Sequence, residues 1–424
     1  MGYCGYCDRY FTNFYDLAMC MTSAVELINP EVAGHHKQTA FWAYEIADTM
    51  GIPLGQQQTL IFAALLHDIG SIPLNETLDY YDENDQTVNR HAIIGARLFS
   101  EFPRLQNVAD VIRFHHIQWD GGKGQHFKGK NVPFLSHILH LADRIAIQVK
   151  KGGYVVSQIP AIKESISRRK GLSFPQEAVN AFLQICDKEA LWLDSMDSSS
   201  FLEIPASLSL KAVQLTLDET VNLTQLFSGI IDFRSPFTAL HSAGVSAVAY
   251  SLAKLCGLSE NECKMMSIAG NLHDIGKIAI PKEILEKQDR LEPVEYDIIR
   301  SHTYYTYRLL KPVSGFEEIT QWAAYHHEKL NGCGYPFHIK ADGLSLGARI
   351  MAVADIFTAI TEDRPYRAGM QKKQTLKSLK SMVDNGSISP SISSRLAENY
   401  GSVDEIRRKA AASAASRYQR LLQV

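Results

Sequence analysis

The sequence lacks several features that would assign it to a large class of protein. No apolar run among its 424 residues is long enough to span a bilayer, and Asp8, Arg9 and Asp16 interrupt the stretch where a signal peptide would have its apolar core. Neither sign of charge dominates, because 43 Lys and Arg face 46 Asp and Glu, a formal net charge of −3. We therefore expect no membrane contact and no binding of long nucleic acid, which needs a strongly basic surface.

Cysteine is too sparse and too irregularly placed to form a disulfide framework. The chain has seven cysteines, an odd number, without the regular spacing of small secreted domains. The simplest expectation is a cytoplasmic protein.

The sequence also has little of the alternation that marks β-strands. Apolar residues recur instead at intervals of three and four, as at Trp42, Ile46 and Met50, which is the helical period. The pattern predicts an all-α protein. It places one helix at about 208–227, at the start of the second half, in the position that residues 11–27 occupy in the first half.

An internal repeat relates the two halves of the chain. The sequence LLHDIG at 65–70 returns as NLHDIGK at 271–277, and the His of each copy follows an earlier His by 32 residues. The match continues to a later His-His pair and Asp in each half, so we interpret the chain as a tandem duplication. We expect two helical HD-type domains, 1–200 and 201–424, joined near the polar segment 195–200.

Five His and two Asp recur in the same order in both halves, which chance does not explain. Helices that converge on one point can each supply one or two such side chains to metal ions. A His and carboxylate set without Cys suits Fe, Mn or Zn. Two ions would leave open positions, with an Asp as bridge, and would activate water to hydrolyse a phosphoester. The repeated residues are His35, His67, Asp68, His91, His115, His116 and Asp143, and then His241, His273, Asp274, His302, His326, His327 and Asp355.

Four motifs of the second half resemble those of a known family. They are HDIGK at 273–277, HHE at 326–328, GCGYP at 332–336 and RPYR at 364–367. The segment from about 208 to 371 resembles the HD-GYP phosphodiesterases, a branch of the HD metal-dependent phosphohydrolase superfamily. The resemblance implies a helical fold, two or three Fe or Mn ions, and hydrolysis of bacterial cyclic dinucleotides, typically cyclic di-GMP.

The resemblance also implies roles for individual residues of the second half. Its seven repeated His and Asp would be the metal ligands, and Asp274 resembles the bridging carboxylate. Lys277 would hold a nonbridging phosphate oxygen, and Tyr335 lies in the GYP loop. Arg364 and Arg367 resemble the arginines that clamp the second phosphate and the bases.

The second half departs from the family pattern at two positions. Members with three metals have a Glu four residues before the first His, where this sequence has Phe237, so we expect two ions in the second half. Thr358 replaces an Asp of the family pattern D-x-F-D-A. Thr358 cannot supply the carboxylate that the family has at this position.

The first half keeps the ligand pattern and loses the motifs that contact substrate. Glu31 stands four residues before His35, so its set includes the extra Glu. Ser71 stands where the second half has Lys277, GGKG at 121–124 replaces the GYP loop, and nothing after Asp143 resembles RPYR. Either this half is a degenerate copy kept for dimerisation or packing, or it binds metal and hydrolyses another phosphoester or senses a ligand. We expect it to bind metal without turning over cyclic dinucleotides.

The leading hypothesis is an enzyme that opens a cyclic dinucleotide to its linear 5′-phosphorylated form. Cyclic di-GMP is the family default. The tandem arrangement also resembles HD-GYP proteins that act on 3′3′-cyclic GMP-AMP, so both substrates stay open. Two alternatives are a regulatory protein that binds cyclic dinucleotide or metal with weak catalysis, and an HD phosphohydrolase acting on another nucleotide. A homodimer is compatible with each of these.

Overall fold

The structure is a computed structural model that describes residues 11–28, 33–74, 89–150, 152–197, 208–232, 240–287, 289–363 and 368–422. In these ranges the protein is helical, and its strands form two short two-stranded ribbons. The all-α class predicted from the sequence is confirmed. Of the described helices, none combines the length and the apolar composition needed to cross a membrane.

The chain forms two compact units. The N-terminal unit comprises Met21–Val213 and Leu421–Val424, and the C-terminal unit comprises Met1–Cys20 and Gln214–Arg420. The expected boundary between residues 200 and 201 falls in 198–207, outside the described residues, and stays a prediction. Residues 11–20 thus belong with the second copy of the repeat.

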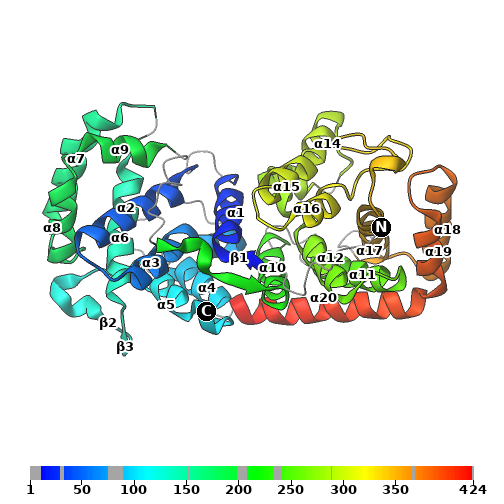
Figure 1. Cartoon of the computed structure of the whole chain (residues 1–424), viewed down its shortest axis with the longest axis horizontal. Helices are drawn as coiled ribbons and strands as arrows, with labels where there is room; N and C mark the ends of the chain where they lie inside the picture. Colours follow the sequence, from blue (N-terminus) through cyan, green and yellow to red (C-terminus); the bar gives the residue numbers. More distant parts are fainter. Residues whose placement is uncertain are drawn as a thin grey trace, which may run out of the picture. The chain divides into compact units, whose positions relative to one another are not determined.

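Helix α2 (His35–Thr49) forms the centre of the N-terminal unit, where it packs against α3 and α6 (Figure 1). Its Trp42 is fully buried, with ring centroids 4.5 Å from Trp192 and 5.8 Å from Phe182. The other elements are the part of α1 (Phe14–Glu26) from Met21 onward, α3 (Leu54–Leu66), η2 (Ile69–Leu74), α4 (Asn89–Ser100), η4 (Pro103–Leu105), α5 (Gln106–Arg113), η5 (Asp120–Gln125), β2 (His126–Phe127), β3 (Lys130–Asn131), α6 (Phe134–Gln148), α7 (Val155–Arg168), α8 (Gln176–Ile185), α9 (Glu189–Met196) and η8 (Leu210–Ala212).

Helix α11 (His241–Leu255) has the same central place in the C-terminal unit, between α12 and α17 (Figure 1). The remaining elements of this unit are β1 (Phe11–Asn13), β4 (Gln214–Thr216), α10 (Leu217–Asp232), α12 (Glu260–Leu272), η9 (Ile275–Ala279), α13 (Lys282–Leu285), α14 (Pro293–Arg300), α15 (His302–Leu310), α16 (Glu317–Ala324), η10 (Ala341–Gly343), α17 (Leu346–Thr361), α18 (Lys372–Asp384), α19 (Pro390–Glu398) and α20 (Tyr400–Leu422).

The helices predicted at 11–27 and 208–227 both begin later than expected. Strand β1 pairs antiparallel with β4, with Phe11 opposite Thr216, so the residues before each helix are extended. The reason lies at Thr216, whose Oγ1 accepts a hydrogen bond from the Glu219 backbone, while the Glu219 carboxylate accepts one from the Thr216 backbone. This reciprocal capping fixes the start of α10 at Leu217.

A glycine in each copy of the HDIG motif allows a very close approach of two backbones. A Cβ at Gly276 would lie 2.0 Å from the backbone oxygen of His302 and 2.6 Å from the backbone nitrogen of Thr306. Gly70 is equally confined, with the backbone oxygen of His91 at 2.1 Å. The glycine therefore brings the His-Asp pair of the motif next to the helix that carries the following His.

Replacing Gly276 with Ala should separate η9 from α15 and destabilise the C-terminal unit by about 1–3 kcal/mol, the usual range for overpacking. Urea unfolding measures this change. Gly229→Ala in α10 is the matched control, because a Cβ there meets nothing within 4 Å among the described residues and Ala favours a helix. Equal stability of the two variants would show that the close approach at Gly276 is unimportant.

Candidate metal centres

The predicted ligands of the C-terminal unit stand mostly at helix ends. His241 begins α11, His302 begins α15, and His273 with Asp274 follows the end of α12. The His326-His327 pair follows α16, and Asp355 lies inside α17. All are buried except His327, whose side chain is 32% exposed. The fold thus brings together residues that are spread over 115 positions of the sequence.

These seven residues form two groups on the two sides of the Asp274 carboxylate. Toward Oδ2 lie His273 Nε2 at 3.1 Å and His241 Nε2 at 3.9 Å, and His241 is also 3.0 Å from Asp355 Oδ1. Toward Oδ1 lie His302 Nε2 at 3.4 Å and His326 Nε2 at 3.9 Å. His327 joins the second group. Each Asp274 oxygen therefore faces a different set of imidazoles, as a bridging carboxylate requires.

Backbone carbonyls orient the rings of this site. The Nδ1 atoms of His273, His302 and His326 lie 2.8, 2.5 and 2.6 Å from the carbonyl oxygens of the residues three positions earlier. His241 differs, because its Nδ1 lies 3.0 Å from a carboxylate oxygen of Glu362. An imidazole that donates from one nitrogen presents the other to a metal. Glu362 lies outside the repeated set, so the spacing of the repeat did not predict it.

Several buried polar atoms of the two units have no hydrogen bond of normal geometry with any described residue. They include His273 Nε2 and Asp274 Oδ1 in the C-terminal unit, and His67 Nε2 and His115 Nε2 in the N-terminal unit. Buried polar atoms are seldom left this way, because the loss of water is not compensated. Divalent cations would satisfy all four atoms, and the nitrogen and oxygen donor set suits Fe, Mn or Zn. The residues therefore fit metal ions.

The electrostatics of the C-terminal site favour the metal-binding protonation state at most of its ligands, with His241 as an exception. Burial raises the pKa of Asp274, but neighbouring His273 and Lys277 outweigh it and hold this pKa well below its usual range. Burial lowers the pKa of His302 to about 3. Burial also lowers the pKa of His241, yet hydrogen bonds with Asp355 and Glu362 raise it to about 10. The carboxylate and most imidazoles are thus ready to coordinate, whereas His241 would release a proton on metal binding.

Two predicted substrate contacts lie beside this site. Lys277 Nζ is 2.6 Å from Asp274 Oδ2, and its side chain is 23% exposed. The Tyr335 ring is 4.9 Å from the His327 ring, and the Arg300 guanidinium lies 4.8 Å from the Tyr335 centroid. Arg300, two residues before a ligand, is a further cation that the sequence analysis missed.

The GYP loop is fastened to the residue that follows the His pair. Glu328 accepts hydrogen bonds from the backbone nitrogens of Phe337 at 2.7 Å and Ile339 at 3.0 Å. A Cβ at Gly334 would lie 2.4 Å from the Glu328 Cα, so only glycine fits there. Hydrogen bonds to Glu328 therefore attach the segment after the GYP motif to the HHE motif, and the loop holds Tyr335 beside His327.

Some predicted residues lie outside the described part of the chain. These are Glu31, Phe237, Arg364 and Arg367, and their roles stay predictions.

The N-terminal unit repeats the two-sided arrangement around Asp68. Oδ2 of Asp68 is 3.1 Å from His67 Nε2, and Oδ1 is 3.3 Å from His91 Nε2 and 4.0 Å from His115 Nε2. His35 Nε2 is 3.1 Å from Asp143 Oδ1, and His116 Nε2 is 3.0 Å from His91 Nε2. The seven predicted His and Asp ligands of the first half therefore lie together.

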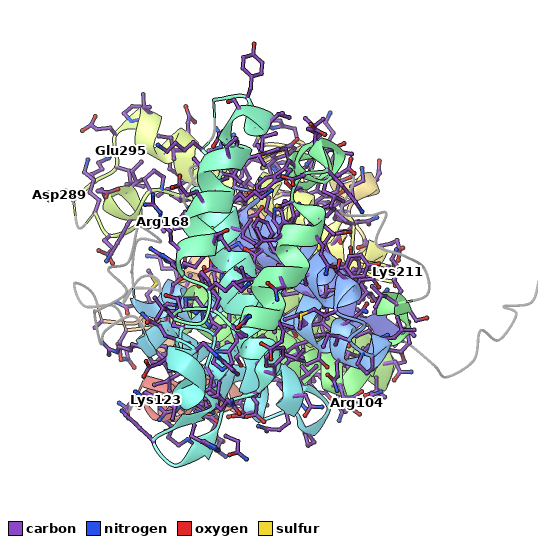
Figure 2. All side chains as sticks on the ribbon, turned by 90° about the vertical axis from the view of Figure 1, so that its left-hand side faces the viewer. Arg104, Lys123, Arg168, Lys211, Asp289 and Glu295 are labelled. Carbon is purple, nitrogen blue, oxygen red and sulfur yellow. The ribbon has the colours of Figure 1, made fainter. Side chains whose placement is uncertain are left out.

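The cations of the N-terminal unit differ from those of its counterpart. Ser71 is buried and donates its hydroxyl to the Asp68 carbonyl, so it does not replace Lys277. Lys123 of the GGKG segment lies at the surface, with its side chain 83% exposed (Figure 2). Arg144, which the sequence analysis missed, donates from Nη2 to Asp143 Oδ2 at 2.8 Å in the buried interior. The N-terminal unit therefore also holds a cation at its site, but this cation pairs with Asp143 and not with Asp68, the counterpart of Asp274.

Comparisons with known proteins agree with this geometry. Family models of the HD domain match residues 32–147 and 225–392. The chain is 29% identical to the 3′3′-cGAMP-specific phosphodiesterase 1 of Vibrio cholerae, over 88% of this chain and 89% of that protein. It is 31% identical to the 3′3′-cGAMP-specific phosphodiesterase 3 of the same organism, over 69% of this chain and 62% of that protein. A cyclic di-GMP phosphodiesterase of Pseudomonas aeruginosa is 35% identical over 37% of each chain.

The fold is also found in a solved structure. It is the crystal structure of a cyclic GMP-AMP-specific phosphodiesterase from Vibrio cholerae, with a TM-score of 0.65 and 22% identity over 92% of this chain and 98% of that one. Two helical units with paired His-Asp centres define a tandem HD-domain protein. The chain belongs to the HD-domain family, and the expected resemblance of its second half to the HD-GYP phosphodiesterases is confirmed.

A buried carboxyl group lies behind the C-terminal site. Asp232, at the end of α10, accepts hydrogen bonds from the Ser242 backbone at 3.0 Å and from the Ser242 hydroxyl at 2.7 Å. Burial raises the pKa of Asp232 to about 7. No sequence pattern predicted a special role for Asp232, because a single Asp in a helix belongs to no motif.

Asp232 should make the stability of the protein decrease between about pH 4 and pH 7. In that window the folded protein keeps a proton that the unfolded chain, with a carboxyl pKa of about 3.9, has already released. Asp232→Asn cannot titrate, so the wild type should lose stability relative to this variant as the pH rises. Urea unfolding at pH 4.5, 6 and 7.5, with the metal content of each sample measured, tests this expectation. Asp218→Asn, at an exposed position of the same helix, is the control. If the free energy of unfolding of Asp232→Asn differed from that of the wild type by the same amount at every pH, the expectation would be contradicted.

Proposed function

We propose that the C-terminal unit hydrolyses a phosphodiester bond of a bacterial cyclic dinucleotide and releases the linear 5′-phosphorylated dinucleotide. The observation that carries this proposal is the position of Asp274, whose two oxygens face two groups of imidazoles while Lys277 contacts the same carboxylate. The names of the relatives support the same activity.

We infer 3′3′-cyclic GMP-AMP as the first substrate to test. The relative that matches nearly the whole chain is named as specific for it, whereas the cyclic di-GMP phosphodiesterase from Pseudomonas aeruginosa matches 37% of the chain. Cyclic di-GMP is the second candidate, because the motifs of the second half resemble those of enzymes that open it.

The residues of the C-terminal site divide the work of such a reaction. Two divalent ions bound there would supply an activated water and neutralise charge on a phosphate oxygen. The Asp274 carboxylate would hold both ions, and its partner Lys277 is exposed enough to donate to a nonbridging oxygen of the substrate phosphate. Tyr335 and Arg300 offer an aromatic face and a guanidinium beside it, which suit a base and a second phosphate.

We further propose two Fe or Mn ions in the C-terminal unit and metal in the N-terminal unit. The donor set supports this proposal, because His and carboxylate ligands suit either metal. The cytoplasmic location and the homodimer expected from the sequence stay predictions.

Turnover should depend on the ligands of the C-terminal unit and not on those of the N-terminal unit. The full chain, purified anaerobically and loaded with Mn or Fe, is incubated with 3′3′-cyclic GMP-AMP or cyclic di-GMP, and the products are separated by chromatography. His273→Ala with Asp274→Ala should abolish the linear product and remove the metal of that unit. His67→Ala with Asp68→Ala is the matched control, and should lose about half the metal, given two similar centres, and change turnover only modestly.

Other outcomes of this assay would contradict the proposal. A ligand that binds and remains intact would indicate a receptor, and a product formed only from a non-cyclic nucleotide would indicate another HD phosphohydrolase. Turnover that survives the change at His273 and Asp274 but is lost in the control would place catalysis in the N-terminal unit.

Replacing Lys277 with Ala should lower turnover while the metal content is retained. The loss of one contact to a developing phosphate charge costs about a hundredfold to a thousandfold in rate. Steady-state kinetics and metal analysis of the same preparation measure the two effects. Lys264→Ala, which removes a surface ion pair with Asp218, is the control. Loss of the metal together with activity would show that Lys277 has a structural role.

A further inference from the structure

Two residues of the N-terminal unit that do not belong to the repeated ligand pattern meet at its metal centre. His36 follows His35 on α2, and Glu26 is the last residue of α1. The His36 side chain is 1% exposed, with Nε2 3.7 Å from Asp68 Oδ2 and Nδ1 3.7 Å from Glu26 Oε1. His36 therefore lies between the centre and a second carboxylate.

His36 has no hydrogen bond at either ring nitrogen within the described part of the chain, and Glu26 Oε1 has none either. A buried imidazole in this state is unfavourable unless another group binds it. The His36 ring centroid lies 5.3 Å from that of His35 and 5.2 Å from that of His67. The ligand atoms of His36, His67 and Asp68 are close enough to hold one ion.

The His67 ring limits how many ions this part of the site can hold. Its Nδ1 lies 2.8 Å from the Ala64 carbonyl oxygen, so only Nε2 is available to a metal. His67 belongs both to the group with His35 and Asp143 and to the group with His36 and Asp68. Because one imidazole nitrogen binds one ion, the two groups surround the same ion.

We propose that His36 is an additional ligand of this ion and that Glu26 orients it. The ion would then have three imidazoles and two carboxylates from the protein: His35, His36, His67, Asp68 and Asp143. Glu26 faces the other nitrogen of His36, in the manner of the carboxylate–histidine–metal arrangement of many sites. This inference concerns metal binding in the N-terminal unit and does not rest on the activity proposed for the C-terminal unit.

The C-terminal unit lacks this ligand at the equivalent position. Both copies have the same spacing, so Ser242 follows His241 as His36 follows His35, and Asp232 precedes Ser242 by ten residues as Glu26 precedes His36. The Ser242 hydroxyl donates to Asp232, away from the metal ligands. The equivalent ion there would have four protein ligands and more room for water or substrate. A closed shell of protein ligands is typical of structural ions, and an open position is typical of catalytic ions.

Mn²⁺ binding to the full chain tests this proposal. Variants carry His273→Ala and Asp274→Ala as background, so that the measured metal belongs to the N-terminal unit. In this background His36→Ser should weaken Mn²⁺ binding at least tenfold in a chelator competition. Glu26→Gln should weaken it about tenfold to a hundredfold, the range for partners behind a ligand. The visible spectrum of the Co²⁺-loaded protein should also change with His36→Ser, because the coordination number falls.

His137→Ser is the matched control. His137 is another buried imidazole of the N-terminal unit, bonded through Nδ1 to the Ile117 carbonyl oxygen at 3.1 Å and outside the three ligand groups described for this unit. Its loss should leave Mn²⁺ affinity unchanged.

Unfolding of the metal-free proteins separates a ligand from a merely structural residue. If His36 is a ligand, His36→Ser should unfold at the same or a higher urea concentration without metal, and at a lower one with Mn²⁺. Unchanged Mn²⁺ affinity in His36→Ser, an absence of bound Mn²⁺ in the background protein, or an equal loss of stability with and without metal would each overturn the proposal.

Discussion

The arrangement of both units depends on one carboxylate that is buried among imidazoles at the end of a helix. Asp274 and Asp68 each present one oxygen to one group of rings and the second oxygen to another. Burial of so many polar groups is costly unless each is paired. Backbone carbonyls that bond to the rings meet part of that cost, and metal ions would satisfy the polar atoms that remain. A glycine lets the two helices approach within backbone contact.

The two centres have diverged in the cations beside this shared arrangement. In the C-terminal unit Lys277 contacts the Asp274 carboxylate and is partly exposed, so its charge is available to an incoming anion. In the N-terminal unit Arg144 donates to Asp143 and is buried. The positive charge of Arg144 therefore stabilises the Asp143 carboxylate, and it contributes less than Lys277 to the binding of an anion from solvent. The cation of the C-terminal unit is therefore reachable from solvent, whereas that of the N-terminal unit is enclosed with the carboxylate that it pairs with.

The sequence predicted the shared part of this design well, because a repeat makes the spacing of ligands visible. The helical class and the grouping of the fourteen His and Asp residues follow from that spacing. What the sequence could not reveal depends on contacts between distant residues. Glu362 contacts His241, and Arg300 contacts Tyr335, although each pair is far apart in the sequence and no local pattern predicts the contact. Two helices were predicted too long for a different reason. The residues before each of them pair as a strand, and Thr216 also caps the start of α10.

The pairing of β1 with β4 has a consequence for how the chain reaches its native state. Phe11 and Thr216 are neighbours in the ribbon although 205 positions separate them in the sequence. During synthesis the first strand emerges long before its partner exists, and the whole first copy of the repeat is made in between. Contacts of such high sequence separation form late and slow the folding of a domain. The C-terminal unit therefore cannot be completed from the second half of the chain alone, and a gene fragment that encodes only the second half would lack one strand of this ribbon.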